Sequence, residues 1–171
     1  YGKRGNYLGE LCFNTSITGY QEILTDPSYF NQIITFTFPH IGIVGTNKHD
    51  YESSRMFASG CIINNSITKA SNFRSELDFE HWLKENKKAC ITGVDTRALT
   101  KKIRESGSLN GLIHFPKKKF ENLNNLKKYL KSFPNMKGQD LASIVSTKKK
   151  YAFNKSLNKE NNGSKKRFIA V

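Results

Sequence analysis

The segment QIITFTF at residues 32–38 places the strongest constraint on how this chain of 171 residues folds. Its residues are mostly β-branched or aromatic, the types that strands favour, and Pro39 follows where a strand would end. Alternate side chains, those of Ile34, Phe36 and Phe38, fall on one face of an extended segment. The segment is therefore predicted to form a strand with an apolar face.

Other segments of the chain carry either strand or helix patterns. Short apolar runs predict further strands, at residues 9–16, 59–65, 89–94 and 110–115. Apolar residues three or four positions apart predict helices, at residues 75–88, 95–107, 121–133 and 140–145. This mixture predicts an α/β or α+β domain, and the pattern alone does not choose between the two classes.

Two of the predicted helices carry signals for where they begin. Ser75 is predicted to cap the first of them, with Asp78 at the capping-box position three residues later. Asp95 is predicted to cap the next helix, and Gly107 to end it. Capping accounts for Asp95 without a functional role, although it lies at a strand-to-helix corner.

The stretch NTSITGYQEILTDPSY at residues 14–29 places many turn-forming residues beside an apolar strand. Gly19 allows a φ angle that other residues avoid, and the pair Asp26 and Pro27 opens a turn. The stretch is predicted to form a shaped loop. Judged by its residue type alone, Ser28 is a turn residue within that loop.

Charge divides the chain into two unequal parts. Residues 1–115 hold 13 Lys and Arg against 11 Asp and Glu, whereas residues 116–171 hold 15 against 3, so most of the net charge of +14 lies in the last third. Such a cluster is consistent with a phosphate-binding surface or with a solvated tail. Only Arg167 among these 15 cations is an arginine, and no aromatic residues and glycines interleave them as in a nucleic-acid motif, so the tail is favoured.

The cysteines indicate a reducing compartment. Cys12, Cys61 and Cys90 are odd in number and widely spaced, which argues against a disulfide framework and against a zinc site.

No apolar run approaches the roughly 18–20 residues that a membrane span requires, and no signal peptide is visible. A cytoplasmic protein without a membrane partner is the expectation.

Catalytic and metal-binding motifs are absent from the sequence. It contains no GxGxxG, GxxxxGK[ST] or GxSxG string. The histidines lack the spacing of metal ligands: His40, His49, His81 and His114. His49 with Asp50 and Glu52 is consistent with a carboxylate–imidazole pair or with a solvated loop, and the loop is favoured. Neither a catalytic residue nor a metal ligand is therefore predicted.

Four long strings change this interpretation when they are taken together. They are GELCFNTSITGYQEILTDPSY, QIITFTFPHIGIVGTN, ASNFRSE and GVDTRALTKKIRESGSLNG, which follow one another within residues 5–115. In order and spacing they resemble the amino-terminal domain of the small, glutaminase chain of carbamoyl phosphate synthase. MKGQDLASIVST resembles the end of that domain, and KKRFIAV resembles the first strand of the family's class I glutamine amidotransferase domain.

The resemblance implies a fold and a domain division. The implied fold is α/β, a swivelling β/β/α three-layer domain with a central sheet, a second sheet and helices on one side. Residues 1–146 would form this domain without its first strands, residues 147–166 a basic linker, and residues 167–171 the first strand of the absent amidotransferase domain. The expectation is a fragment cut at both ends. Cys12 falls at a strand position that is ordinarily aliphatic in the family, so it is not a displaced nucleophile.

The resemblance also implies partners and a site. The small chain pairs with a large chain, which uses ATP and magnesium and combines ammonia from L-glutamine with bicarbonate, for arginine and pyrimidine synthesis. No cofactor is expected on this chain itself. In the family, the serine of the DPSY turn contacts glutamine in the neighbouring glutaminase domain, and here that residue is Ser28.

Two alternatives to the enzyme-subunit interpretation remain open from the sequence. One is a basic module that binds nucleic acid or another polyanion. The near-neutral charge of residues 1–115 argues against it, because such a module should carry its cations on the folded body. The other is a truncated product without function, which differs from the enzyme subunit only in the coding sequence downstream of Val171.

Overall fold

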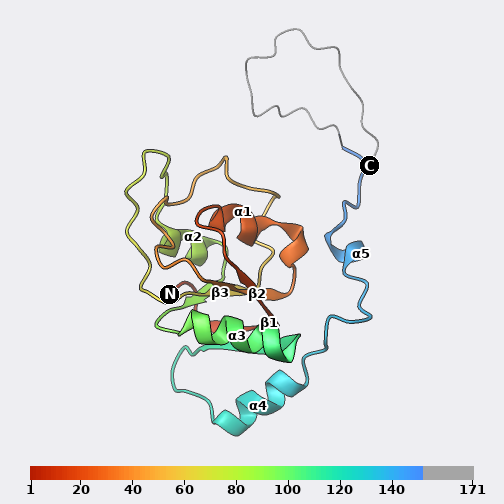
Figure 1. The fold of residues 1–171 in the computed structure, drawn as a ribbon. Coiled ribbons are helices and arrows are strands. Elements are labelled where there is room, and N and C mark those ends of the chain that lie inside the picture. Colours follow the sequence, from red (N-terminus) through yellow and green to blue (C-terminus); the bar gives the residue numbers. More distant parts are fainter. Residues whose placement is uncertain (152–171) are drawn as a thin grey trace.

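In the computed structural model, which describes residues 1–151, five strands form one mixed sheet (Figure 1). The strands lie in the order β4-β3-β2-β1-β5. Their bounds are Gly5–Asn14 for β1, Gln32–Phe36 for β2, Gly60–Ile62 for β3, Ala89–Ile91 for β4 and Leu109–Phe115 for β5. The strand predicted at residues 32–38 is therefore confirmed over residues 32–36, and it lies at the centre of the sheet.

Four of the five strands run parallel, and the last runs against them. β1 pairs with β2, β2 with β3 and β3 with β4 in parallel, whereas β5 pairs with β1 antiparallel. Parallel neighbours need crossover connections. Helix α1 (Tyr20–Thr25) and the 3-10 helix η1 (Pro27–Tyr29) lie on the connection from β1 to β2, and α2 (Phe79–Glu85) lies between β3 and β4.

Helices cover both faces of the sheet (Figure 1). On one face, Leu24 of α1 and Trp82 of α2 belong to the same buried cluster as Ile34 of β2. On the other face, Ile33 of β2 lies in a second cluster, against which Leu99 of α3 (Thr96–Ser106) packs. The alternation of side chains along β2 therefore separates two cores. Helices α4 (Leu123–Lys131) and α5 (Ala142–Val145) follow β5 and bury no residue of their own.

The structure confirms the α/β class and corrects two details of the predicted fold. Helices were expected on one side of the sheet, but α1 and α2 lie opposite α3. Within residues 1–151 the strands form a single sheet, without the expected second one. Both faces need cover because β2 carries buried side chains on each of them. The name of the fold, swivelling β/β/α, stays a prediction.

The two capping predictions have different outcomes. Asp95 caps α3 as predicted, because its carboxylate accepts a hydrogen bond of 2.9 Å from the backbone N–H of Ala98. The prediction for Ser75 is wrong, since α2 begins at Phe79 with Asp78 at the N-cap. Residues 76 and 77 instead donate their backbone N–H groups to the carbonyl of Thr46. That pairing holds the chain extended where the helix was expected.

All three cysteines fall in one row across the sheet. The register places Cys12 beside Ile34, Ile34 beside Cys61, and Cys61 beside Cys90. All four residues belong to the core that faces α1 and α2 or pack against it. Cys61 and Cys90 are buried and Cys12 is half-buried, and all three are free thiols. Their role here is packing, as expected for small buried thiols.

Candidate functional site

Helix α1 occupies residues where only a shaped loop was predicted. Gly19 precedes it in the left-handed region, with φ 81°, and accepts a hydrogen bond of 2.9 Å from Ile23. Tyr20 and Leu24, one turn apart, are both buried against the sheet. The helical spacing of these two residues was the signal that could have revealed α1, but the turn-forming residues around it obscured that spacing.

The Ser28 turn lies directly after α1, and its geometry is that of a fixed turn, as predicted. The carboxylate of Asp26 accepts a hydrogen bond of 2.8 Å from the backbone N–H of Ser28. Pro27 sits at the first position of η1, where its restricted φ angle suits a helical turn. The backbone N–H groups of Tyr29 and Phe30 donate to the carbonyls of Asp26 and Pro27, at 3.1 and 3.0 Å.

The side chain of Ser28 takes no part in these bonds. Ser28 is exposed, and within residues 1–151 no hydrogen bond engages its hydroxyl group. A serine hydroxyl can donate one hydrogen bond and accept two. The turn therefore presents an unengaged donor and acceptor on a rigid backbone, which suits contact with an amide or a carboxylate.

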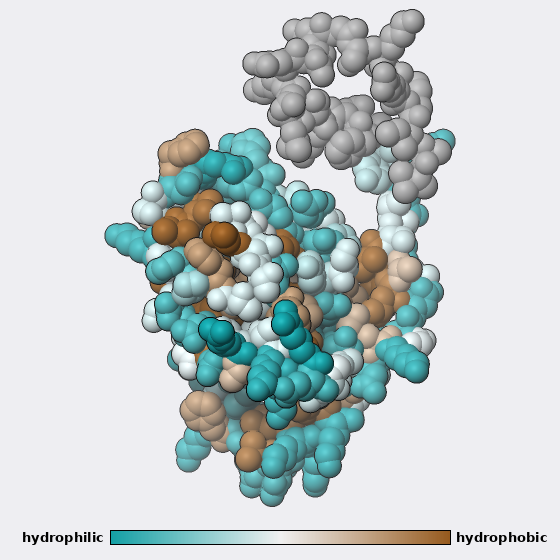
Figure 2. Space-filling model, in the orientation of Figure 1, coloured by the Kyte–Doolittle hydropathy of each residue, from teal (hydrophilic) through white to brown (hydrophobic). Residues whose placement is uncertain are grey.

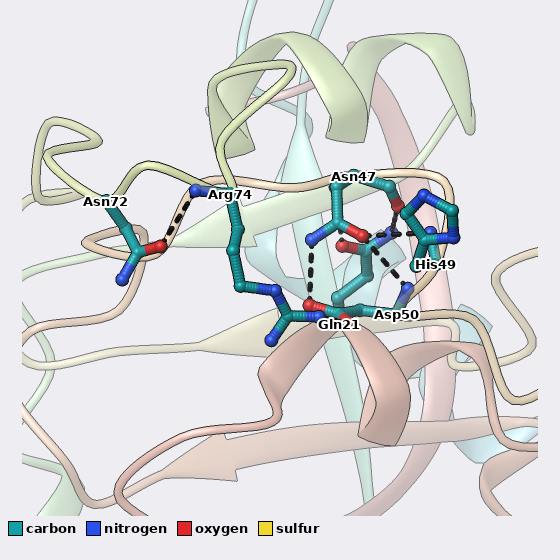
Figure 3. A network of polar contacts seen from close by, with 6 residues as sticks. All are labelled: Gln21, Asn47, His49, Asp50, Asn72 and Arg74. Atoms are coloured by element: carbon teal, nitrogen blue, oxygen red, sulfur yellow. Dashed lines mark hydrogen bonds and ion pairs between the residues drawn. The ribbon is translucent and has the colours of Figure 1, made fainter. Parts of the chain in front are cut away.

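A network of polar contacts anchors the first turn of α1 to the loop that follows β2 (Figure 3). The side chain of Gln21 donates to the backbone carbonyl of Asn47 at 2.6 Å and accepts from the backbone N–H of Asn47 at 2.9 Å. Both residues are buried, with exposures of 2% for Gln21 and 6% for Asn47. Sequence reasoning missed this pair because the two residues lie 26 positions apart.

The network continues from Asn47 to Asp50 and Arg74 (Figure 3). The Asn47 carboxamide donates to the Asp50 carboxylate at 2.8 Å, and its oxygen accepts from the backbone N–H groups of His49 and Asp50. The guanidinium of Arg74 pairs with the other oxygen of Asp50. The favoured prediction of a solvated loop at His49, Asp50 and Glu52 is confirmed for His49 and Glu52, which are exposed, but it is wrong for Asp50, which also has no imidazole partner within residues 1–151. Its side chain is only 12% exposed, and its partners are an amide and a guanidinium.

An open pocket of about 240 Å³ lies over this network and the start of α1. Tyr20, Glu22, Asp50, Asn72 and Arg74 contribute to its walls. Burial raises the pKa of the Glu22 carboxyl, and burial also raises that of the Tyr20 hydroxyl, which donates to the carbonyl of Gly45 at 2.6 Å. Arg74 pairs with Asp50, and its backbone N–H donates to the Asn72 carboxamide oxygen at 2.9 Å, so the geometry favours a structural anchor over reactive chemistry.

Among the described residues, neither the Cys12 thiol nor a cluster of metal-ligating side chains forms a reactive centre. Burial, and then the charge of Glu10, raise the pKa of the Cys12 thiol to about 12, so Cys12 stays protonated near neutral pH. Within residues 1–151 no group of three or more His, Cys, Asp or Glu residues is placed to hold a metal ion. Among the same residues, no helix is both long and apolar enough to cross a membrane.

Comparison with known proteins gives one consistent family. Residues 1–113 match the family model described as carbamoyl-phosphate synthase small chain, CPSase domain. Curated relatives called carbamoyl phosphate synthase small chain include the Zymomonas mobilis protein, 44% identical over 95% of this chain and 44% of the relative. The Vibrio cholerae protein is 49% identical over 89% of this chain and 40% of its own length. The chain thus spans about two fifths of the length of these relatives.

Proposed function

Because the chain belongs to the family of carbamoyl phosphate synthase small chains, we propose that it forms the part of a small subunit that completes the glutamine site and docks on the large chain. Family membership confirms the resemblance seen in the sequence. The observation that carries the proposal is the Ser28 turn, whose backbone is fixed by Asp26 and whose exposed hydroxyl is free to meet a ligand.

In this proposal the subunit divides the chemistry between two parts. The family's glutaminase domain supplies a cysteine and a histidine. The cysteine thiolate attacks the carboxamide carbon of glutamine to form a C–S bond, the C–N bond breaks, and the nitrogen takes a proton from the histidine and leaves as ammonia. Water then cleaves the resulting thioester to give glutamate. Ser28 contributes by a hydrogen bond to glutamine, which helps to hold the substrate while the bond breaks. The present chain contributes no nucleophile of its own.

The remaining steps belong to the large chain. Ammonia passes to it and reacts with bicarbonate that has been activated with ATP, and the product feeds arginine and pyrimidine synthesis. ATP and magnesium are expected on the large chain, and no cofactor on this one. The enzyme is a ligase, it works as a heterodimer of small and large chains, and we place it in the cytoplasm.

The proposed domain division follows the family pattern. Residues 1–146 form the amino-terminal domain of the small chain, an α/β domain that we assign to the swivelling fold of that family. Residues 147–166 form a basic linker, most of which lies outside the described residues. The strand proposed at residues 167–171, the first of an amidotransferase domain, lies wholly outside them.

Exposed hydrophobic side chains within residues 1–146 are candidates for the docking surface. Figure 2 shows hydrophobic residues at the surface near the bottom of the view, where α4 lies in Figure 1. Exposed apolar side chains in this part of the chain include those of Phe120, Leu123 and Tyr129. Such groups on a protein surface often belong to an interface.

Co-expression with the cognate large chain tests the proposal. The large chain should co-purify with this chain, and it should still do so after residues 147–171 have been deleted. The isolated chain should not hydrolyse glutamine. Docking that requires residues 147–171 would show that the proposed surface on the body is wrong, and ammonia release that disappears in a Cys12→Ser variant would overturn the division of chemistry.

A further inference from the structure

We propose that Gln21 and Thr25 are positioning residues for Ser28. They fix α1 to the loop at residues 46–52, and α1 in turn sets the direction in which the Ser28 hydroxyl points. This inference rests on the proposed contact between Ser28 and glutamine. It adds two buried side chains, neither of which would touch the substrate.

The first anchor is the pair of hydrogen bonds between Gln21 and Asn47. The Gln21 carboxamide uses its N–H and its oxygen on the backbone of one residue, at 2.6 and 2.9 Å. Two hydrogen bonds to one backbone residue, as between paired strands, fix both the distance of α1 from the loop and the rotation of α1 about its own axis. Asn47 is itself held, because its side chain bonds to His49 and Asp50 within the same loop.

The second anchor lies one helical turn later on the same face of α1. Thr25 is fully buried, and its hydroxyl donates to the backbone carbonyl of Gln21 at 2.9 Å. The same oxygen accepts a hydrogen bond of 3.0 Å from the backbone N–H of Glu52. Gln21 and Thr25 therefore join both ends of α1 to the two ends of one loop.

A helix as short as α1 depends on such anchors. It has six residues, whereas isolated helices shorter than about 12–15 residues are only marginally stable in water. Its direction must therefore come from tertiary contacts. The carbonyl of Leu24 adds two more, since it accepts from the backbone N–H groups of Phe57 and Ala58 at 3.0 and 3.2 Å.

The link from α1 to Ser28 is short and stiff. Asp26 is both the C-cap residue of α1 and the N-cap residue of η1, and Pro27 follows with a restricted φ angle. Ser28 is thus three residues beyond the second anchor, with no flexible segment between them. A small tilt of α1 is therefore expected to carry the Ser28 hydroxyl with it.

The test uses Thr25→Val in the full-length small chain, assembled with its large chain. Valine keeps the shape of threonine but leaves the N–H of Glu52 without its partner. We expect the KM for glutamine to rise about two- to tenfold, and no more than in Ser28→Ala, with ammonia-dependent synthesis unchanged. Thr25→Ser keeps the hydroxyl and should restore the KM. Gln21→Met removes the other anchor. It should likewise raise the KM for glutamine and leave ammonia-dependent synthesis unchanged.

Thr100 offers a matched control. Its side chain is also buried and its hydroxyl also donates to the carbonyl four residues earlier, at 2.7 Å, but it lies on α3 across the sheet. Thr100→Val removes the same kind of bond within a helix and should leave the KM for glutamine unchanged. If Thr25→Val affects glutamine and ammonia reactions equally, or if Thr100→Val raises the KM as much, Thr25 has only a structural role and the inference is wrong.

Ser28→Ala separates failure of this inference from failure of the proposed function. If Ser28→Ala leaves glutamine kinetics unchanged, the proposed substrate contact fails and this inference fails with it. If Ser28→Ala raises the KM and neither Thr25→Val nor Gln21→Met does, only the inference fails. When Thr25 acts through Ser28, the double variant Thr25→Val with Ser28→Ala should be no worse than Ser28→Ala alone.

Discussion

Cys61 and Cys90 lie directly opposite each other on the neighbouring parallel strands β3 and β4, and both are buried in the core beneath α1 and α2. A hydrogen bond with Cys90 and burial raise the pKa of the Cys61 thiol well above its usual range. A thiol reacts with alkylating and disulfide reagents only as its thiolate and only when a reagent can reach it. Both conditions are unfavourable for this pair in the folded protein.

The folded chain should therefore protect these two thiols. At about pH 8, Cys61 and Cys90 are expected to react with a chromogenic disulfide reagent far more slowly than a free cysteine, and all three thiols should react at once in denaturant. Counting the thiols modified over time measures this directly. Reaction of the pair at the rate of an exposed thiol would mean that β3 and β4 open readily.

The half-buried Cys12 should make stability depend on pH in alkaline solution. Its pKa is about 12 in the folded chain against a usual value of 9.0, so above about pH 9 the unfolded chain loses a proton that the folded chain keeps. Ionisation then favours unfolding, and stability should fall between about pH 9 and pH 12 while it is unaffected below pH 8. Cys12→Ala should reduce this fall, measured as the change in urea midpoint between pH values. The other titrating groups are common to the original chain and the variant. An identical loss of stability in the two proteins would therefore show that Cys12 is not its cause.

Removing the cap of α3 should destabilise the domain. Asp95→Ala leaves the backbone N–H of Ala98 without its partner, which should lower the free energy of unfolding by about 1 kcal/mol. Asp95→Asn keeps an oxygen acceptor and should cost only a few tenths of a kcal/mol. Urea unfolding of both variants measures the difference. Equal stability of the alanine and asparagine variants would show that the cap contributes little.

Substitution of Ser28 should affect only the glutamine-dependent reaction. Ser28→Ala removes one hydrogen bond to the substrate, which costs about 0.5–1.5 kcal/mol and should raise the KM for glutamine about two- to tenfold. Ser28→Phe should raise it further, because the ring would fill the site. Ammonia-dependent synthesis should remain near normal, since free ammonia does not need the glutamine site.

Ser106 provides the control for this pair of variants. It is an exposed serine at the end of α3, across the sheet from α1. Ser106→Phe should leave both reactions unchanged. If Ser28→Phe also leaves glutamine kinetics unchanged, or if it impairs both reactions equally, Ser28 is only a turn residue.

The basic last third should bind nucleic acid only weakly. Residues 116–171 carry a net charge of +12, from 15 cations and 3 anions, and 14 of those cations are lysines. Lysine-rich segments bind phosphate without reading sequence, and salt weakens that binding steeply. Titration of labelled DNA and RNA should show association at low salt that is lost at about 0.15 M salt. A sequence-specific complex that survives this salt would favour the alternative of a nucleic-acid module.

Much of the fold was predictable because the chemistry that specifies it is local. The strand at β2 follows from β-branched and aromatic residues in alternation, and α3 follows from a cap, a spacing of apolar residues and a terminal glycine. Each of these signals lies within about a dozen residues. The family resemblance was likewise contained in the sequence, because it depends on long strings in a fixed order.

Only the tertiary structure decided the features that join distant segments. Residues around α1 favour turns, and the helix forms there because Leu24 is buried against the sheet and Gln21 is paired with a residue 26 positions away. Asp50 meets Arg74 across 24 positions, so its sequence neighbours gave no indication of its partner. The placement of helices on both faces of the sheet likewise depends on where α3 packs. The sequence by itself thus determined the family and the elements with strong local patterns, such as β2 and α3, whereas long-range burial and hydrogen bonding determined α1 and how the Ser28 turn is held.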